Sequence, residues 1–136
     1  IKVAISFDKE SAGVSRASFV DALTAELPAT ELREREGPLI GTGYVRPIYL
    51  EPMFKERIGY GDKGCPFLCP HYDGELNYDL GICPEVENAH FETVITHELM
   101  RPPVSKNDLD DVVRAVEKVV ENLPALRAYE ARESKG

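Results

Sequence analysis

The sequence lacks the features that mark several large classes of protein. No apolar run approaches the ~20 residues that span a bilayer, and we expect no signal peptide. Basic residues are outnumbered, since 16 Lys and Arg against 24 Asp and Glu leave a net charge of −8. Nucleic acid and anionic membrane surfaces are therefore excluded as expected partners, because both require a basic patch. Three cysteines in 136 residues do not form a disulfide framework, which favours a reducing, cytoplasmic location.

Complete catalytic motifs are missing as well. Gly41 and Gly43 stand without the rest of a nucleotide-binding glycine fingerprint, and no GxxxxGK[ST] loop occurs. Asp108, Asp110 and Asp111 are explained by the first turn of a helix, where carboxylates favour the positive end of the helix dipole. No local sequence marks a cysteine as an activated nucleophile. The residues alone identify no catalytic group.

What the sequence does contain is the pattern of one folded domain over residues 1–136. Its 43% hydrophobic and 29% charged residues are typical of a globular protein. The predicted elements are a strand at 1–7, a turn at 8–14, a helix from Ser15 to Pro28, a β-rich run at 40–50, a helical turn at 53–58, an irregular loop at 59–83, a helix at 84–92, a strand at 93–99 and a helix after Ser105. This order predicts an α+β fold, with a small antiparallel sheet of about three strands and helices on one side.

The best-defined predicted elements are the first strand and the last long helix. In the strand, Ile1, Val3, Ile5 and Phe7 alternate onto one face. In the helix, Ser105 and Asp108 fit a capping box. The apolar stripe predicted for that helix consists of Leu109, Val112, Val113, Val116, Val120 and Leu123. Pro124 is expected to kink or end it, with a polar helical tail beyond.

All three cysteines lie in or at the end of the irregular loop. Cys65, Cys69, His71 and Cys83 supply the ligand types of a zinc site, but only one closely spaced pair, and structural zinc sites usually have two. Proline follows each of Cys65 and Cys69 and restricts the backbone there. Buried, unreactive cysteines are the favoured interpretation, and a zinc-stapled binding module without catalysis stays as the alternative.

Three stretches carry a resemblance to a known family: GYVRPIYLEPMF at 43–54, CPEVEN at 83–88 and THELMRPPVSKNDLDDVVRAVEKV at 96–119. In this order they resemble the C-terminal domain of the DegT/DnrJ/StrS group of sugar aminotransferases, which use pyridoxal phosphate. Val86 and Tyr49 depart from the residues usual in that family, and the cysteine-rich insert is longer than in many members. Because the chain also opens directly in strand pattern at Ile1, we expect it to be the C-terminal piece of a longer polypeptide, or the product of trimming.

The resemblance implies the small domain of a fold type I, pyridoxal-phosphate-dependent aminotransferase that forms homodimers. It implies transfer of an amino group from glutamate or glutamine to a keto sugar or cyclitol, with the cofactor bound mainly by an N-terminal domain absent from this chain. None of the seven lysines resembles the Schiff-base lysine, so no catalytic, cofactor-binding or metal-binding residue is expected here. The expected substrate-binding residues are Tyr44, Arg46, Tyr49, His71 and Tyr72. Arg46 has the fork geometry that pairs with the carboxylate of an amino donor.

Overall fold

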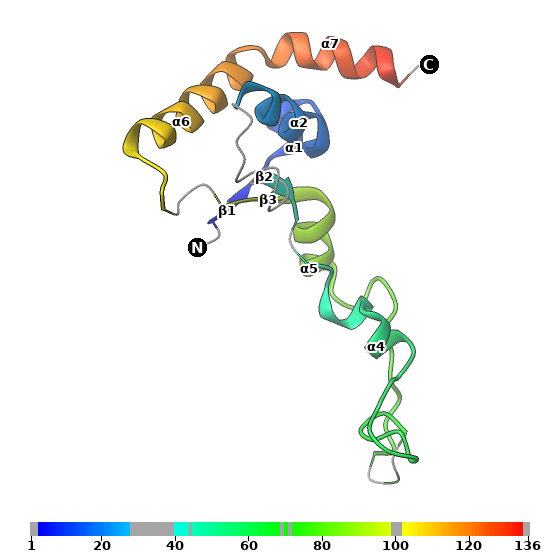
Figure 1. The fold of residues 1–136 in the computed structure, drawn as a ribbon. Coiled ribbons are helices and arrows are strands. Elements are labelled where there is room, and N and C mark those ends of the chain that lie inside the picture. The colour runs from blue at the N-terminus through cyan, green and yellow to red at the C-terminus, as the bar shows by residue number, and fades with distance from the viewer. Residues whose placement is uncertain are drawn as a thin grey trace.

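The computed structural model describes residues 3–27, 40–43, 45–68, 70, 72–98 and 102–134. These residues build two regions that differ in shape (Figure 1). One, which we call the body, contains the sheet, its helices and both ends of the described chain. The other, which we call the arm, consists of the described residues of 45–83 and extends away from the body (Figure 1). Residues 84–93 connect the arm back to the sheet.

The sheet is antiparallel and has three strands, β1 (Val3–Ser6), β2 (Ile40–Thr42) and β3 (Val94–His97). Their spatial order is β1-β3-β2, so the last strand in sequence lies in the middle. Both outer strands run antiparallel to β3. The predicted α+β class with a small three-stranded antiparallel sheet is thus confirmed for the described residues.

One face of the sheet carries its large apolar side chains. Ile5 lies opposite Ile95, and Val3 lies opposite His97. Directly opposed residues of an antiparallel pair project to the same face, so the predicted alternation is confirmed for Val3 and Ile5. Ile1 lies outside the described residues. Phe7, next in the alternation, continues the pairing through its N–H to Thr93 O at 2.7 Å and is buried.

A short helix, α1 (Lys9–Ala12), replaces the predicted turn after β1. The carboxylate of Asp8 caps it by accepting hydrogen bonds from the N–H groups of Glu10 and Ser11 at 3.0 and 3.2 Å. A hydrogen bond from Ser11 Oγ to Asp8 Oδ2 at 2.6 Å, together with these backbone bonds, lowers the pKa of Asp8. Gly13 ends the helix with φ +67°, a backbone conformation that L side chains rarely adopt. The prediction failed because one turn of helix is too short to produce a periodic pattern.

Helix α2 (Arg16–Glu26) packs on the apolar face of the sheet (Figure 1). Ser15 caps it as predicted, accepting a hydrogen bond from Ser18 N at 3.1 Å. Phe19 contacts Phe7 with ring centroids 5.1 Å apart. The buried core is formed by Phe7, Ala12, Val14, Phe19, Val20, Leu23, Ile40, Ile95, Ala115 and Val119. Every one of these residues belongs to the body.

The long helix α6 (Lys106–Glu121) closes this core. Its predicted capping box is confirmed, since Ser105 and Asp108 each bond the other's backbone N–H. The predicted apolar stripe is wrong in part. Ala115 and Val119 are the buried residues, whereas Val113 and Val120 are exposed. At about 100° per residue, the two exposed valines lie too far around the helix to face the core together with Ala115 and Val119.

The chain continues into a second helix, α7 (Leu123–Glu133), with Pro124 in its first turn. This confirms the helical tail and the end of the long helix before Pro124. Two side chains fix α7 to the loop between α1 and α2. Arg127 Nε donates to Ala12 O at 2.8 Å, and the Glu130 carboxylate accepts from Ser15 N at 3.1 Å and from Ser18 Oγ at 2.8 Å. Hydrogen bonds from Ser15 and Ser18 lower the pKa of Glu130.

The arm contains little regular structure. The β-rich run predicted at 40–50 yields only β2, followed beyond Pro47 by one 3₁₀ turn, η1 (Ile48–Leu50). The helical turn predicted at 53–58 is present slightly earlier, as α4 (Pro52–Lys55). The described part of the loop at 59–83 has no helix, as predicted. Nowhere in the described chain is a helix both long and apolar enough to cross a membrane.

The return segment consists of α5 (Pro84–Asn88), which passes directly into a short π-helix, η2 (Ala89–Thr93). Together they match the helix predicted at 84–92, and Pro84 occupies its first turn. The chain then enters β3. The arm is therefore an excursion between two neighbouring strands, β2 and β3.

Candidate functional site

The structure describes three of the five expected substrate-binding residues, and all three lie on the arm. Tyr44 and His71 fall outside the described residues. Arg46 is exposed and follows β2 by a few residues, Tyr49 is buried, and Tyr72 is 46% exposed farther along the arm. Tyr49 is thus packed inside the protein, whereas Arg46 and Tyr72 face solvent.

Tyr49 closes the base of the arm. Its hydroxyl donates a hydrogen bond to Glu87 Oε1. The same carboxylate oxygen accepts from Gly81 N at 2.7 Å and from Cys83 N at 3.3 Å. Glu87 therefore joins the outgoing segment of the arm, through Tyr49, to its returning segment, through Gly81 and Cys83. We call this set of contacts the latch.

The latch changes the titration of both side chains. Burial, together with the hydrogen bond to Glu87, raises the pKa of Tyr49 to about 12. The hydrogen bond from Tyr49, with smaller contributions from Gly81 and Cys83, lowers the pKa of Glu87. Both shifts favour a neutral phenol beside an ionised carboxylate. The latch is consequently complete near neutral pH.

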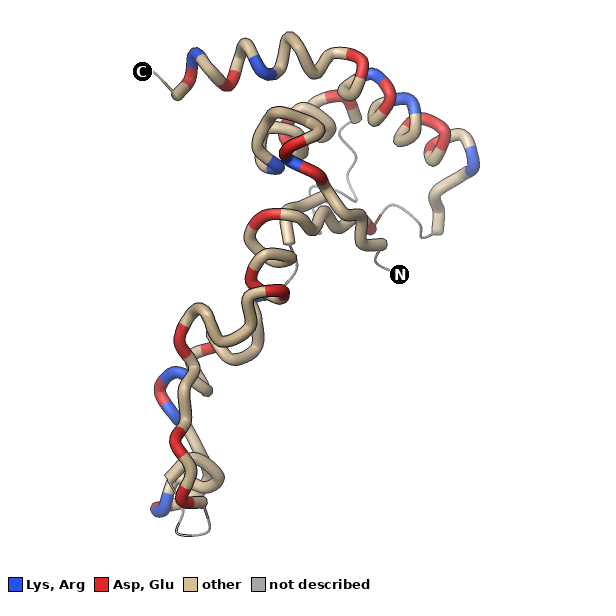
Figure 2. The backbone as a smooth tube through the Cα atoms, turned by 180° about the vertical axis from the view of Figure 1, so that it is seen from behind, with Lys and Arg blue, Asp and Glu red and all other residues tan. Residues whose placement is uncertain are grey.

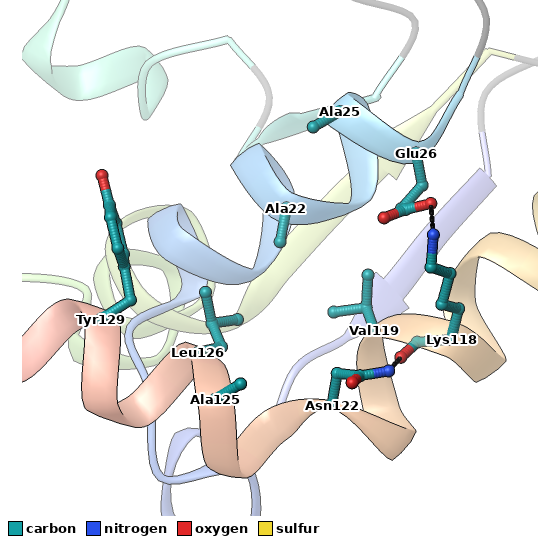
Figure 3. Close-up of a pocket in the computed structure, with 9 residues that line it drawn as sticks. All are labelled: Ala22, Ala25, Glu26, Lys118, Val119, Asn122, Ala125, Leu126 and Tyr129. Carbon is teal, nitrogen blue, oxygen red and sulfur yellow. Dashed lines mark hydrogen bonds and ion pairs between the residues drawn. The ribbon is translucent and has the colours of Figure 1, made fainter.

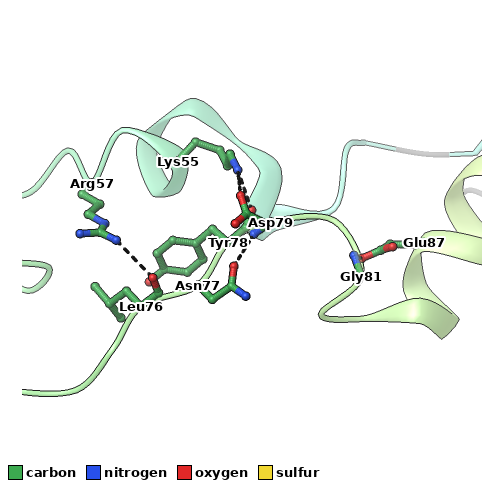
Figure 4. A network of polar contacts seen from close by, with 8 residues as sticks. All are labelled: Lys55, Arg57, Leu76, Asn77, Tyr78, Asp79, Gly81 and Glu87. Atoms are coloured by element: carbon green, nitrogen blue, oxygen red, sulfur yellow. Dashed lines mark hydrogen bonds and ion pairs between the residues drawn. The ribbon is translucent and has the colours of Figure 1, made fainter.

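Farther out, two basic side chains tie the outgoing and returning segments of the arm together (Figure 4). Lys55 Nζ donates to Tyr78 O at 3.1 Å and pairs with Asp79 Oδ1 at 2.6 Å. Arg57 donates from its guanidinium to Leu76 O at 3.2 Å. The bond from Lys55 lowers the pKa of Asp79. These ties align residues 76–79 with the end of α4 and the turn after it, although no ladder of backbone bonds connects them.

Three aromatic rings fill the space between the same strands. Phe54, Phe67 and Tyr78 contact one another with centroids 5.6 to 6.2 Å apart and mostly edge-to-face. Such ring pairs contribute roughly 0.5–1.5 kcal/mol beyond the burial of their area. They are the nearest equivalent of a core within the arm.

An apolar groove of about 550 Å³ lies beside this ring cluster. Besides the three rings, its lining consists of Met53, Ile58, Gly59, Tyr60, Pro66, Tyr72 and Leu76. Tyr72, one of the expected substrate-binding residues, is thus part of an aromatic wall. Grooves of this size and character are typical of ligand or partner sites.

The far part of the arm is a tight hairpin. Cys65 N donates to Tyr60 O at 3.1 Å and Tyr60 N donates to Cys65 O at 2.5 Å. A side chain at Gly59 would place its Cβ 2.4 Å from Cys65 O, so only glycine permits this approach. Gly61 and Gly64 both have positive φ in the intervening turn.

Arg16 anchors the return segment to the body. Its guanidinium donates to His90 O at 3.0 Å, to Phe91 O at 2.7 Å and to Val94 O at 2.8 Å. Carbonyls near the C-terminal end of a helical segment, here those of His90 and Phe91 in η2, lack partners within the helix, and a guanidinium satisfies both at once. Val94 O lies in β3 and also accepts from Gly43 N at 2.7 Å. Burial lowers the pKa of Arg16, and Glu92 opposes that shift.

The zinc alternative receives no support from the described residues. Cys69 and His71 lie outside them, and Cys83 is the N-cap of α5, where its N–H belongs to the latch. Among the residues that the structure describes, no three His, Cys, Asp or Glu side chains converge as metal ligands would. Sequence and structure together therefore favour a structural role for Cys83.

A second groove, of about 400 Å³, lies in the body between α2, α6 and α7 (Figure 3). Ala22, Val119 and Leu126 contribute apolar surface, and the ion pair of Lys118 with Glu26 at 2.5 Å borders it. Its apolar residues are also the ones that join the three helices. The groove is thus a gap left by the packing of the three helices, and none of its lining residues indicates a ligand.

Charges of both signs are interspersed along α6 and along the arm (Figure 2). Residues 45–83 contain four basic and six acidic side chains. The described surface therefore has no basic stripe of the kind that binds a nucleic-acid backbone.

Comparisons with family models, with curated proteins and with solved structures find no match to this chain.

Several residues of this region were not predicted from the sequence. Glu87, Phe54, Phe67 and Tyr78 were not among the expected site residues. The sequence feature that could have indicated the ring cluster is the concentration of aromatic residues between positions 49 and 78. Their contacts join positions 11 to 24 residues apart, which periodicity does not reveal.

Proposed function

We propose that this chain is the substrate-recognition domain of a pyridoxal-phosphate-dependent aminotransferase acting on a keto sugar or cyclitol. The proposal rests on the resemblance carried by the stretches at 43–54, 83–88 and 96–119. The observation that supports it best is the placement of Arg46 and Tyr72 on an arm that the body holds away from itself. An exposed guanidinium recognises a carboxylate, and an aromatic wall packs against a sugar or cyclitol ring.

The lysines that the structure describes do not fit a cofactor site. A Schiff-base lysine requires a lowered pKa and a shielded position, whereas Lys55, Lys106 and Lys118 are bound in exposed ion pairs, and Lys9 and Lys63 are exposed. We therefore assign the cofactor, the catalytic lysine and the chemistry to an N-terminal domain outside this chain. Here the proposed contribution is binding and orientation of the amino donor and the acceptor, in a homodimer as the resemblance implies.

The experiment is steady-state amino transfer by the polypeptide in which this chain follows a cofactor domain. We expect Arg46→Ala to raise KM for glutamate or glutamine by about 10- to 100-fold, the range for losing a charged hydrogen bond, and Arg46→Lys to recover part of it. Lys63→Ala, an exposed change on the same arm, is the matched control. An unchanged KM removes Arg46 from the site. Absence of a lysine-bearing cofactor domain upstream of this chain refutes the proposal as a whole.

A second candidate is a non-catalytic module that binds a small molecule or a protein. The apolar groove of about 550 Å³ on the arm favours it, because a groove binds ligands without any catalytic group. In its zinc-stapled form, the module requires Cys65, Cys69, His71 and Cys83. Metal analysis of the purified chain tests that form: absence of zinc, with serine replacements at all three cysteines leaving the fold intact, eliminates it.

A further inference from the structure

The segment that carries Arg46 lies between two buried points. Gly43 before it and Pro47 after it are buried, and so is Tyr49. Arg46 itself is exposed. Fixing an exposed, flexible side chain at the moment of binding costs conformational entropy, and the cost rises if its backbone must be ordered too. The contacts that hold this backbone therefore help to decide how well the guanidinium can bind a ligand.

On one side, the sheet holds the segment. Gly43 N donates to Val94 O at 2.7 Å, and Thr96 Oγ1 donates to Gly43 O at 2.9 Å. Gly43 has φ +69°, and an added Cβ there would lie 2.7 Å from His90 O. The backbone thus passes close to η2 at this point. The first end of the segment is fixed to the body.

On the other side, the segment enters the turn η1. Leu50 N donates to Pro47 O at 2.8 Å, and Glu51 N donates to Ile48 O at 3.1 Å. These two bonds make residues 47–51 one local unit. Tyr49 is the buried side chain of η1. A contact that holds the Tyr49 side chain therefore holds the whole turn.

Glu87 provides that contact. Its Oε1 accepts from the hydroxyl of Tyr49, and also from Gly81 N at 2.7 Å (Figure 4) and from Cys83 N at 3.3 Å. Glu87 belongs to α5, which passes through η2 into the central strand β3. Removal of its carboxylate would take the acceptor from a phenol hydroxyl and two N–H groups at once. The turn would then lose its connection to the return segment through Tyr49.

We propose that Glu87 is a positioning residue for the amino donor. Through Tyr49 it fixes the turn, and the turn fixes the point from which Arg46 projects. The chain between the Cα atoms of Arg46 and Tyr49 spans at most about 11 Å, so a shift of the turn is passed on to Arg46. A binding group that is oriented before its ligand arrives binds at lower cost. This inference rests on the function proposed above, in which Arg46 binds the carboxylate of glutamate or glutamine.

Steady-state amino transfer by the polypeptide in which this chain follows a cofactor domain tests the proposal. We expect Glu87→Ala to raise KM for the amino donor by about 5- to 20-fold and to leave kcat within about twofold, because the guanidinium is present but less well placed. Glu87→Gln keeps an accepting oxygen and should stay within about threefold of the unaltered KM. Glu85→Ala removes an exposed carboxylate from the same helix and is the matched control, with KM unchanged.

A double variant separates this role from a general loss of structure. Added to Arg46→Ala, Glu87→Ala should raise KM by no more than about a further twofold, because residues that act through one group are not additive. An unaltered KM in Glu87→Ala, or its full effect repeated in the Arg46→Ala background, overturns the inference and leaves the proposed function standing. An unaltered KM in Arg46→Ala alone instead overturns the proposed donor site, and the inference falls with it.

Because Glu87→Ala can also impair folding, Tyr49→Phe is measured in parallel. This variant removes one hydroxyl and keeps the ring in its buried site. We expect KM for the donor to rise about threefold, with the melting temperature unchanged. An unaltered KM at an unaltered melting temperature contradicts a role that acts through Tyr49.

Discussion

The body and the arm are held in place by different kinds of contact. In the body, ten buried residues from β2, β3, α1, α2 and α6 and from the connections that flank α1 form one cluster, and removal of apolar surface from water provides the stability. In the arm, the large apolar side chains are mainly exposed, and the chain is positioned by a latch, two basic ties and three rings. A region can therefore be held in position without a core, and its exposed apolar surface is then available for binding.

The largest effect is expected from breaking the core of the body. Phe19→Ala removes a buried ring that contacts Phe7 at 5.1 Å, and such truncations cost about 3–5 kcal/mol. The free energy of unfolding from chemical denaturation measures it. Val113→Ala, at an exposed site of α6, is the control and should change that free energy by no more than about 0.5 kcal/mol. Equal losses at the two sites would mean that the core is not where the structure places it.

Glycine-to-alanine substitutions compare the two regions at nearly the same backbone conformation. Gly13 and Gly61 have φ +67° and +63°, but an added Cβ at Gly13 would lie 2.6 Å from Arg127 Nε, whereas nothing lies within 4 Å at Gly61. Gly13→Ala strains the backbone and displaces the Arg127 bond to Ala12, for a loss of about 2 kcal/mol. Gly61→Ala should change the global free energy of unfolding by less than about 0.5 kcal/mol, because the tip opens locally. Similar global losses would show that arm and body unfold as one unit.

The latch predicts a pH window for order at the base of the arm. Glu87 has a lowered pKa, so its contribution is present above its ordinary value of 4.5 and is lost as the pH falls below it. Tyr49 has a pKa raised to about 12, so its contribution is complete below its ordinary value of 10.0 and is lost as the pH rises toward 12. Hydrogen exchange at the N–H groups of Gly81 and Cys83, corrected for intrinsic rates, should show protection between these limits.

Tyr49→Phe isolates the hydroxyl of the latch. We expect exchange at Gly81 and Cys83 to become about tenfold faster near neutral pH, while the melting temperature of the body is unchanged. Tyr60→Phe, which removes an exposed hydroxyl from the same arm, is the control and should leave exchange at both positions as it was. Unaltered exchange in Tyr49→Phe would show that Glu87 orders residues 81–83 without Tyr49.

The smallest effect is expected from the ties farther along the arm. Lys55→Met removes the exposed ion pair with Asp79 and the bond to Tyr78 O. Exposed ion pairs contribute little and are screened by salt. Exchange near residue 78 should accelerate by about two- to fivefold at low salt, and less in high salt. Lys106→Met, which removes an ion pair from α6, should leave the arm unchanged.

Local signals explain what the sequence predicts well. Ser15, Ser105 and Asp108 identify helix starts because a cap is decided by residues a few positions apart. Alternation identifies β1 for the same reason. The short α1 was missed because Asp8 and Gly13 enclose a single helical turn, and the apolar stripe of α6 was misplaced because its valines are too many for one narrow face.

The candidate site is less predictable because its contacts are long in sequence. Glu87 meets Tyr49 across 38 residues, and the ring cluster joins Phe54 to Tyr78. Contacts between residues this far apart leave no periodic pattern and no fixed spacing in the sequence. Tyr49 was expected to touch substrate, yet the structure shows its hydroxyl bonded to Glu87, while Arg46 and Tyr72 remain on the surface. Tyr44 and His71 lie outside the described residues, and their role stays a prediction.

The arm is held by its own contacts, outside the core of the body, and is therefore expected to open separately from it. Hydrogen exchange of the chain at increasing denaturant concentration tests this most directly. The predicted result is that the amides of residues 53–60 and 76–82 lose protection at a lower denaturant concentration than those of β3 and α2. Loss of protection in arm and body at the same denaturant concentration would contradict it.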